Sequence, residues 1–527
     1  MKNIYINGKV YTEKGKFAEG FIVENGVFTR VGSTDDILSD MEEKNVVDLK
    51  GKTVIPGIND SHAHLFMLAK SYREVYLLGV ESIDEVIEKS KQFIEDNPEV
   101  KAVYGMGWNK EFFTSGEIRD LTRDDLDLVS LEIPVVLRRA CGHMLSANSK
   151  AIEMSGVNEN TVIPGGDFDY EKGHFFENAC NPLIELIPEP TDEELIVLMK
   201  RAMKDCMSKG ITTVQVNECT TSGSRESVVN TYRDLFKKEE NLVRIHHQIF
   251  FDSIEEFDDF LNTEKKDPVF NTLMQDIGPM KLFKDGSLGA RSALVKEEYL
   301  DSKGNTGIKV LSDEDCDKFL KFAYDNNLQV VTHVIGDRGL NEMVKDYSKY
   351  TGEDNPLRWG IIHTQLSDRE DLDLIKKYNI ATLVQPIFLR ADIVTLKKAV
   401  SEKLQSTSYA FGTMVREGIH MSFGTDTPVE EIDPFNNIYW AVARKKIGDK
   451  EAFFEKECVG IEDAIDAYTI ESAYIEFKED FKGRIKEGYL ADFVVLDRDI
   501  FTIETEEIPD VKVLETFING KKVYQLL

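Results

Sequence analysis

The chain has 527 residues, 42% of them hydrophobic and 10% aromatic, and its formal net charge at pH 7 is −31. This hydrophobic content supports a large packed core and argues against an intrinsically disordered chain. The strong negative charge would repel nucleic acid and anionic membrane surfaces, so we predict neither as a partner. We interpret the acidity as a source of solubility.

The spacing of the cysteines and the composition of the first residues indicate the cellular compartment of the protein. The six cysteines are scattered and include no C-x-x-C pair, which is typical of free thiols in a reducing environment. No stretch approaches the roughly 18 apolar residues of a membrane-spanning helix, and the first residues lack the pattern of a signal peptide. These features predict a cytoplasmic protein without membrane partners.

The two ends of the chain read as short β-strands joined by tight turns. Residues 6–9 and 518–521 both read Ile-Asn-Gly-Lys, and Asn-Gly is a strong hairpin signal between strands. Each end is too short to fold well alone. We therefore predict that residues 1–53 and 480–527 pair into one small β-sandwich domain.

Residues 54–479 alternate between apolar, strand-like segments and amphipathic, helix-like segments. Alternating strands and helices predict a parallel sheet in an α/β fold, and eight such units predict a closed (β/α)₈ TIM-like barrel. The eight strand candidates are residues 54–66, 211–218, 243–251, 279–283, 328–333, 358–363, 380–384 and 420–426.

One interval in this pattern is too long for a single strand–helix–strand crossover. The chain runs from residue 66 to residue 211 between the first two strands, and this stretch contains strand-like segments of its own. We interpret residues 70–190 as an α/β subdomain inserted into the first loop. Loops at that end of a barrel surround the active site, so we expect the insertion over the active-site mouth.

Ionisable side chains lie at the ends of the predicted barrel strands. Barrel enzymes carry their catalytic residues at the same ends. The first strand ends in His62-Ala63-His64, whose two imidazoles share one face and form half of a metal site. A single strand-end histidine is more often a satisfied polar residue, but the combination indicates a metal centre. The other candidates are Lys281 or Lys284, His333, His363 and Asp426.

Several stretches of the chain match the motifs of a known family. They are residues 55–64, 142–149, 281–291, 333–338, 363–365, 424–428 and 483–493. On these motifs the chain resembles the amidohydrolase superfamily, and within it the amidohydrolase 3 family, which includes N-substituted formamide deformylase-like proteins. The resemblance covers essentially the whole chain and implies an enzyme, an amidohydrolase acting on carbon–nitrogen bonds other than peptide bonds.

The resemblance also implies a binuclear metal centre. Its implied ligands are His62, His64 and Asp426 for one ion, His333 and His363 for a second, and a bridging, N6-carboxylated Lys281. We choose Lys281 over Lys284 because the family spacing Lys-x-Phe-x-Asp-Gly matches it. A protonated lysine repels a cation, whereas carboxylation turns it into an anion. The alternative is an unmodified Lys281 with one metal ion or a loosely held pair.

The implied ligand set predicts the chemistry. Imidazole and carboxylate suit Zn²⁺, with Fe²⁺, Mn²⁺ or Ni²⁺ as alternatives. A metal-activated hydroxide would attack the substrate, with Asp426 as general base. We therefore predict a metal-dependent hydrolase of amide, N-formyl, lactam or amidine bonds in a small molecule. Ester hydrolysis, metal-dependent decarboxylation or isomerisation, and a non-catalytic ligand-binding regulatory role are the alternatives.

Three further residues are candidates for binding substrate. His143, in the insertion, would reach the mouth, Trp108 would form an aromatic wall, and Arg291 would hold a carboxylate or orient the fourth loop. Each has a structural alternative: a loop hydrogen-bond donor, a packed core residue and a salt bridge, respectively. The sequence leaves open the physiological substrate and whether the chain forms a homo-oligomer.

Overall fold

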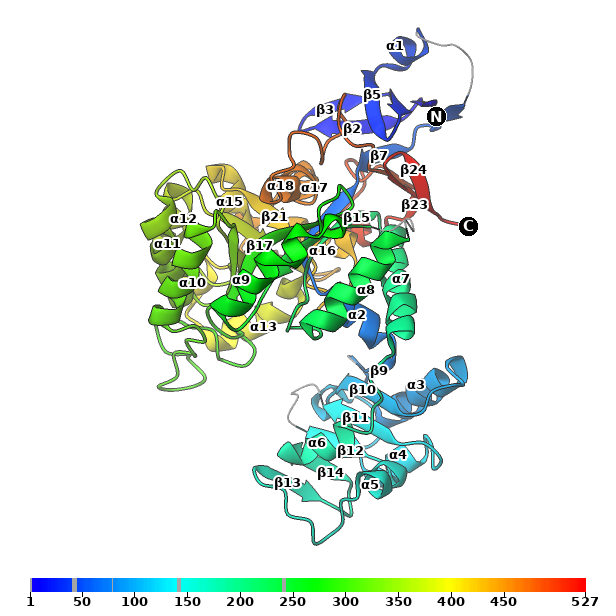
Figure 1. Ribbon diagram of the computed structural model, residues 1–527, viewed down its shortest axis with the longest axis vertical. Helices are drawn as coiled ribbons and strands as arrows, with labels where there is room; N and C mark the ends of the chain where they lie inside the picture. Colours follow the sequence, from blue (N-terminus) through cyan, green and yellow to red (C-terminus); the bar gives the residue numbers. More distant parts are fainter. Residues whose placement is uncertain (1, 40–44, 78, 140–143, 239–242) are drawn as a thin grey trace. The chain divides into compact units, whose positions relative to one another are not determined.

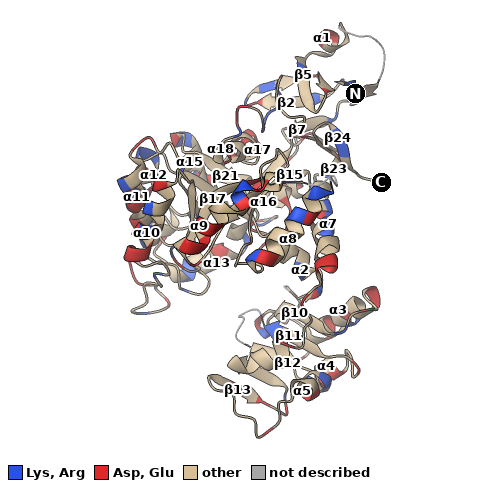
Figure 2. Cartoon of the chain, in the orientation of Figure 1, with Lys and Arg blue, Asp and Glu red and all other residues tan. Residues whose placement is uncertain are grey.

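The computed structural model describes residues 2–39, 45–77, 79–139, 144–238 and 243–527 (Figure 1). The chain divides into two compact units, Met1–Met67 with Met199–Leu527, and Leu68–Leu198. Asp and Glu side chains are frequent on helices around the barrel such as α9 (Ile254–Asn262) and α10 (Asp313–Asp325) (Figure 2). Within these described ranges, no helix is long and apolar enough to cross a membrane.

The larger unit contains a parallel eight-stranded barrel, which confirms the predicted fold class. Most residues of these strands are buried, because a parallel sheet is covered on both faces. In sheet order the strands are β8 (Ile58–Ala63), β15 (Ile211–Asn217), β16 (Arg244–Ile249), β17 (Gln275–Phe283), β18 (Val330–Val334), β19 (Gly360–His363), β20 (Ala381–Val384) and β21 (Met421–Phe423).

The barrel closes between its first and last strands through Asp60. Its buried carboxylate accepts hydrogen bonds from the backbone N–H of Thr425 (3.0 Å) and from the Thr425 hydroxyl (2.5 Å). Next to it, the N–H of Asp426 donates to the carbonyl of His62 at 2.8 Å. Burial raises the pKa of Asp60 to about 7. Strand closure therefore occurs at the residues that the sequence predicts as metal ligands.

The opposite end of the barrel is held by a buried carboxylate, Glu476, just after α18 (Ile470–Ile475). It accepts hydrogen bonds from Asn59 (2.6 Å), Gln215 (3.2 Å) and Lys482 (2.7 Å), and Lys478 lies at 3.0 Å. Burial opposes ionisation, but the two lysines outweigh it and lower the pKa of Glu476 to about 2. This network ties the first two strands to the C-terminal segment.

The β-sandwich combines strands from both ends of the chain. One sheet contains β5 (Val27–Gly32), β4 (Gly20–Glu24), β1 (Lys2–Ile6) and β6 (Val46–Asp48). The other contains β24 (Lys521–Gln525), β23 (Val513–Ile518), β22 (Phe493–Leu496), β7 (Thr53–Pro56), β2 (Lys9–Glu13) and β3 (Lys16–Ala18). Aromatic rings fill the core between them, and Phe493 stacks on Phe517 with ring centroids 4.2 Å apart.

The sandwich leads directly into the barrel, because only Gly57 separates β7 from β8. A Cβ atom at Gly57 would lie 2.4 Å from the hydroxyl oxygen of Thr212 on β15, so only glycine fits this approach. Its N–H donates to the carbonyl of Asp492 at 2.8 Å. The C-terminal part of the chain thereby fixes where the first barrel strand begins.

The second unit, Leu68–Leu198, is built on a six-stranded sheet. Its strands are β13 (Gly166–Asp169), β14 (His174–Glu177), β12 (Met144–Ala147), β11 (Val135–Arg139), β10 (Val103–Trp108) and β9 (Glu74–Tyr76). One apolar cluster includes residues of α3 (Ile83–Asp96) and α4 (Arg123–Asp127), and another includes residues of α5 (Ser149–Ser155) and α6 (Asn181–Ile184). The unit therefore has a core of its own.

The Glu476 network makes a testable contribution to stability. In Glu476→Gln the lysine charges stay buried without their counter-charge, which costs about 3 kcal/mol of the free energy of unfolding. Urea unfolding at pH 7 measures this loss. The control is Glu479→Gln, which removes the partly exposed ion pair between Glu479 and Arg358. Loss of this pair should lower the free energy of unfolding by at most about 1 kcal/mol.

The same network predicts a pH dependence. The folded-state pKa of Glu476 is about 2 and its ordinary value 4.5, so its charge contributes stability above pH 4.5 that is lost as the pH falls toward 2. The difference in unfolding free energy between wild type and Glu476→Gln should shrink over that range. A difference that stays constant from pH 6 to pH 3 would contradict this assignment.

Candidate metal centre

Two histidines from the first barrel strand and one aspartate after the last strand converge at the closure of the barrel. The ligand atoms of His62, His64 and Asp426 all lie within 4.8 Å of one another. The Nε2 atoms of His62 and His64 are 3.5 Å and 3.2 Å from Oδ1 of Asp426. This arrangement could hold a metal ion with nitrogen and oxygen ligands.

Hydrogen bonds fix the orientation of both imidazoles. Nδ1 of His62 lies 2.8 Å from Oε1 of Gln248, whose amide nitrogen donates to the carbonyl of Ser61. Nδ1 of His64 donates to the carbonyl of Asn217 at 2.6 Å. Because these oxygens only accept, Nδ1 carries the proton and Nε2 keeps its lone pair for a metal.

Two more histidines, on β18 and β19, extend the cluster. Nδ1 of His363 donates to Oε1 of Gln385 at 2.7 Å. The ring of His363 lies 5.8 Å from the ring of His62 and 4.6 Å from that of His333. Nδ1 of His333 is 3.4 Å from Oδ1 of Asp285. With the contact between His62 and His64, the four imidazoles therefore form one continuous group inside the barrel.

Lys281, on β17, is fully buried beside this group. Among the described residues, its Nζ has no hydrogen-bond partner, and neither has Oδ1 of Asp426. Burial lowers the pKa of Lys281 to about 7, although Asp426 favours its charged form. A buried amine without a partner and an unpaired carboxylate oxygen fit a site completed by cations, since buried polar groups normally have partners.

Lys284, the alternative, points away from the imidazoles. Its Nζ lies 3.5 Å from Glu342 and 3.7 Å from Asp346, both on α11 (Asp337–Thr351), and 3.6 Å from Asp313. These three carboxylates lie on α10 and α11, which are helices and not strands of the barrel. The alternation of β17 therefore places Lys281 inside the barrel and Lys284 toward its helices.

The electrostatics of the cluster suit metal ligands. Burial and the neighbouring Lys281 hold the pKa of His62 well below its usual value, and burial with His333 does the same for His363. Burial disfavours the charged form of Asp426, but the surrounding histidines lower the pKa of that carboxyl below its usual range. Neutral imidazoles and an ionised carboxylate are the protonation states that bind a cation.

Two of these residues have a strained backbone. His363 has φ 79° and Asp426 has φ 57°, in the left-handed region that non-glycine residues rarely adopt. Backbone hydrogen bonds stabilise both conformations. The N–H of Thr364 donates to the carbonyl of Val334, and the N–H of Asp426 donates to the carbonyl of His62. Such strain is typical of functional sites, where the surrounding fold imposes it.

The residues that orient the imidazoles are not among those predicted from the sequence. They are Asn217, Gln248 and Gln385, which bind Nδ1 of three histidines, and Asp285, which lies 3.4 Å from Nδ1 of His333 without a hydrogen bond. Each follows or ends a barrel strand, so a polar residue at the end of an apolar segment was the available signal. Asp285 also accepts hydrogen bonds from the backbone of Leu294, Ile335 and Gly336, which joins two loops of the site.

Two of the three predicted substrate contacts, Trp108 and Arg291, bind other residues of the protein. Trp108 is fully buried in the core of the second unit, where its indole N–H donates to the carbonyl of Leu137. Arg291 binds Asp301 at 2.5 and 2.8 Å and the carbonyl of Leu288. These contacts favour a packing role for Trp108 and a loop-orienting role for Arg291. His143 lies outside the described residues.

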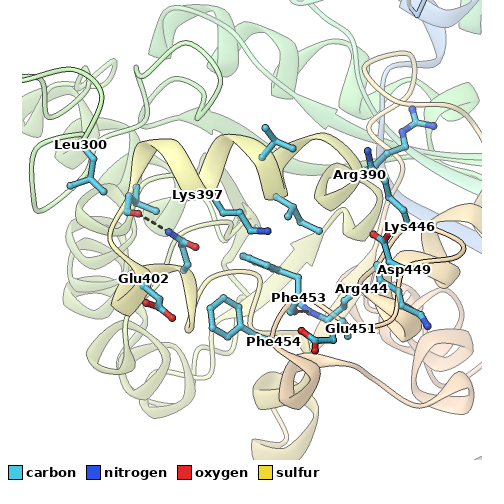
Figure 3. Close-up of a pocket in the computed structure, with 16 residues that line it drawn as sticks. Leu300, Arg390, Lys397, Glu402, Arg444, Lys446, Asp449, Glu451, Phe453 and Phe454 are labelled. Atoms are coloured by element: carbon cyan, nitrogen blue, oxygen red, sulfur yellow. Dashed lines mark hydrogen bonds between the residues drawn. The ribbon is translucent and has the colours of Figure 1, made fainter.

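A separate cavity of about 890 Å³ lies along α13 (Leu389–Ala399) (Figure 3). Lys397 of that helix and Arg444 lie on either side of Phe453, each 5.9 Å from its ring. None of the predicted metal ligands lines this cavity. The cavity is therefore distinct from the metal centre.

The fold and the ligand cluster define a class of protein, and comparison with known proteins identifies it. Residues 45–524 match the model of the amidohydrolase family, Amidohydro_3, so the chain belongs to this family and is a hydrolase. YtcJ of Bacillus subtilis (strain 168), whose name assigns it to the amidohydrolases, is 29% identical over the full length of both chains. The N-substituted formamide deformylase of Arthrobacter pascens is 22% identical over 99% of this chain and 98% of its own.

A solved structure supports the same relationship. The crystal structure of an uncharacterized metal-dependent hydrolase from Pyrococcus horikoshii OT3 matches with a TM-score of 0.77 and 26% identity. It covers 96% of this chain and 99% of its own. The predicted membership of the amidohydrolases is thus confirmed.

The hydrogen bond from His62 to Gln248 predicts an effect on metal affinity. Gln248→Leu leaves Nδ1 of His62 without its acceptor, so metal affinity should fall about 10- to 100-fold. Competition with a chromophoric chelator measures the affinity. The matched control is Gln275→Leu, which removes the same kind of contact from His247, outside the cluster, and should leave metal affinity unchanged. Equal losses in both variants would contradict the role of Gln248.

Proposed function

We propose that this protein is a metal-dependent hydrolase that cleaves non-peptide carbon–nitrogen bonds in small molecules. The observation that carries the proposal is the convergence of neutral, oriented imidazoles on Asp426, an ionised carboxylate with an unpaired oxygen. Family membership supports hydrolysis. The name of the Arthrobacter pascens relative supports an amide-type bond, since N-substituted formamides contain one.

The residues suit one or two divalent ions, with zinc favoured by the nitrogen and oxygen ligands. His62, His64 and Asp426 would hold one ion, and His333 and His363 a second, with carboxylated Lys281 between them. A bound ion supplies Lewis acidity and lowers the pKa of water to about 7. The lowered pKa of Lys281 supports carboxylation, because only a neutral amine reacts with carbon dioxide.

Asp426 is the proposed general base and acid. Its ionised Oδ1 can take a proton from water and return it to the leaving nitrogen, which must be protonated to depart as an amine. Oδ1 is free for this transfer because no described residue donates a hydrogen bond to it. Gln248 and Asn217 meanwhile hold the imidazoles of His62 and His64 in place.

The reaction class can be tested with matched substrates. We expect metal-loaded protein to hydrolyse at least one of a panel of N-formyl amines, N-acyl amines, lactams and amidines. Activity should disappear with a chelator and return with Zn²⁺, Mn²⁺ or Fe²⁺. Turnover of matched esters alone would exclude the carbon–nitrogen assignment, and a protein that binds no divalent metal would exclude the metal centre.

Replacing Asp426 tests the proton transfer. Asp426→Asn keeps the shape but cannot take a proton, so kcat should fall about 100- to 10,000-fold. Metal content is measured on the same sample to separate loss of the base from loss of the metal. Asp433→Asn, at the N-terminus of α16 (Pro434–Ala443), is the control and should keep kcat within about twofold. Retention of wild-type kcat in Asp426→Asn would refute the assignment.

Lysine carboxylation has a direct spectroscopic signature. Protein loaded with metal in ¹³C-bicarbonate should show a carbamate carbon resonance, and the signal should be absent from Lys281→Met. The matched control is Lys284→Met, which changes the buried lysine on the helix-facing side of the same strand and should retain the signal. A signal that persists in Lys281→Met, or no signal in wild type, would reject Lys281 as the modified residue.

A further inference from the structure

The side chains of the metal centre differ in how far they are exposed. Side chains of His62 and Asp426 are only 2% and 8% exposed, whereas those of His64 and His333 are 12% and 15% exposed. The exposed edges of His64 and His333 are therefore the parts of the cluster that a substrate can reach. The residues beside these edges determine what kind of substituent can accompany the scissile bond.

Phe283 and Phe250 stand next to that approach. Phe283 lies two residues after Lys281 on β17, and its ring is 5.6 Å from the ring of His333 and 4.6 Å from Nζ of Lys281. Phe250, directly after β16, meets Phe283 edge to face at 5.0 Å. Two aromatic rings from neighbouring strands thus form a continuous apolar surface beginning at a predicted metal ligand.

Phe388 adds a third aromatic ring to the surroundings of the cluster, against His363. It ends η5 (Pro386–Phe388), after β20, and its ring is stacked on His363 at 6.0 Å with an angle of 19°. Phe250, Phe283 and Phe388 all remain partly exposed. The neighbouring Phe251, in contrast, is buried among Phe257 and Phe260 of α9. The partly exposed rings therefore keep a free surface beside the metal centre.

We propose that Phe250, Phe283 and Phe388, here called the phenylalanine wall, bind an aromatic ring that the substrate carries close to its scissile bond. This inference rests on the proposed function for the bond itself. Aromatic rings favour edge-to-face and offset stacked contacts with one another, and partly exposed rings offer both. The other role of such a wall is to keep water from the centre, which would affect every substrate equally.

Matched substrates separate these roles. N-(2-phenylethyl)formamide and N-ethylformamide test a ring on the amine side, and N-ethylphenylacetamide and N-ethylacetamide test one on the acyl side. We expect kcat/KM for the aromatic member of at least one pair to exceed that of its partner by at least roughly tenfold. Equal values within both pairs, or preference for both smaller members, would overturn the proposal.

Variants then locate the preference. Phe250→Leu and Phe388→Leu should each raise KM for the preferred aromatic substrate roughly three- to tenfold, with less than about twofold change for its small partner. Phe454→Leu, a partly buried phenylalanine along the cavity at α13, is the matched control and should change neither. Equal losses for both members of the pair would assign the wall to water exclusion and overturn ring recognition.

Binding distinguishes this inference from the proposed bond specificity. Calorimetry with the metal-loaded protein compares 2-phenylethylamine and ethylamine, neither of which can be hydrolysed. Tighter binding of the aromatic amine that is lost in Phe250→Leu supports the wall even if no amide is turned over. Hydrolysis of amides without any aromatic preference in rate or binding would retain the proposed function and reject the wall.

Discussion

The closure of the barrel between β8 and β21 is the constraint on which the rest of the structure depends. Asp60 binds both the backbone and the hydroxyl of Thr425, and the Asp426 N–H donates to the carbonyl of His62. These bonds join the strand that carries His62 and His64 to the segment that carries Asp426. Ligands far apart in the sequence therefore meet because the sheet closes there, and the strained backbone of Asp426 is held by the same contact.

Burial gives this site its chemistry. Removal from water favours the neutral form of His62, His363 and Lys281, while the surrounding histidines keep Asp426 ionised. The fold thus gathers neutral nitrogen ligands and one carboxylate away from water. Among the described residues, Nζ of Lys281, Oδ1 of Asp426 and Nδ1 of His333 have no hydrogen-bond partner. Such an arrangement has little value for stability alone, because unpaired buried polar groups are costly. Its residues are better explained by a bound cation.

The sequence predicted the barrel and the ligand candidates because both have local signatures. Buried parallel strands are short apolar segments separated by amphipathic helices, and a strand-end histidine or aspartate stands out against them. The residues that orient those ligands have weaker signatures. Gln248 and Gln385 are ordinary polar residues until the strands bring their amides to His62 and His363. Trp108 shows the reverse case, since a conspicuous aromatic residue proves to fill a core.

The sequence by itself determined the fold class and the family, because hydrophobic periodicity and short motifs can be recognised without knowing which residues are in contact. The motif spacing of the family it resembles also favoured Lys281 over Lys284. Only the tertiary structure decided how these residues are used. It placed Lys284 among helix carboxylates, gave each of three imidazoles an Nδ1 acceptor, and set Phe250, Phe283 and Phe388 beside the centre. The physical reason is that orientation, burial and pKa depend on neighbours distant in sequence, which only the folded barrel brings together.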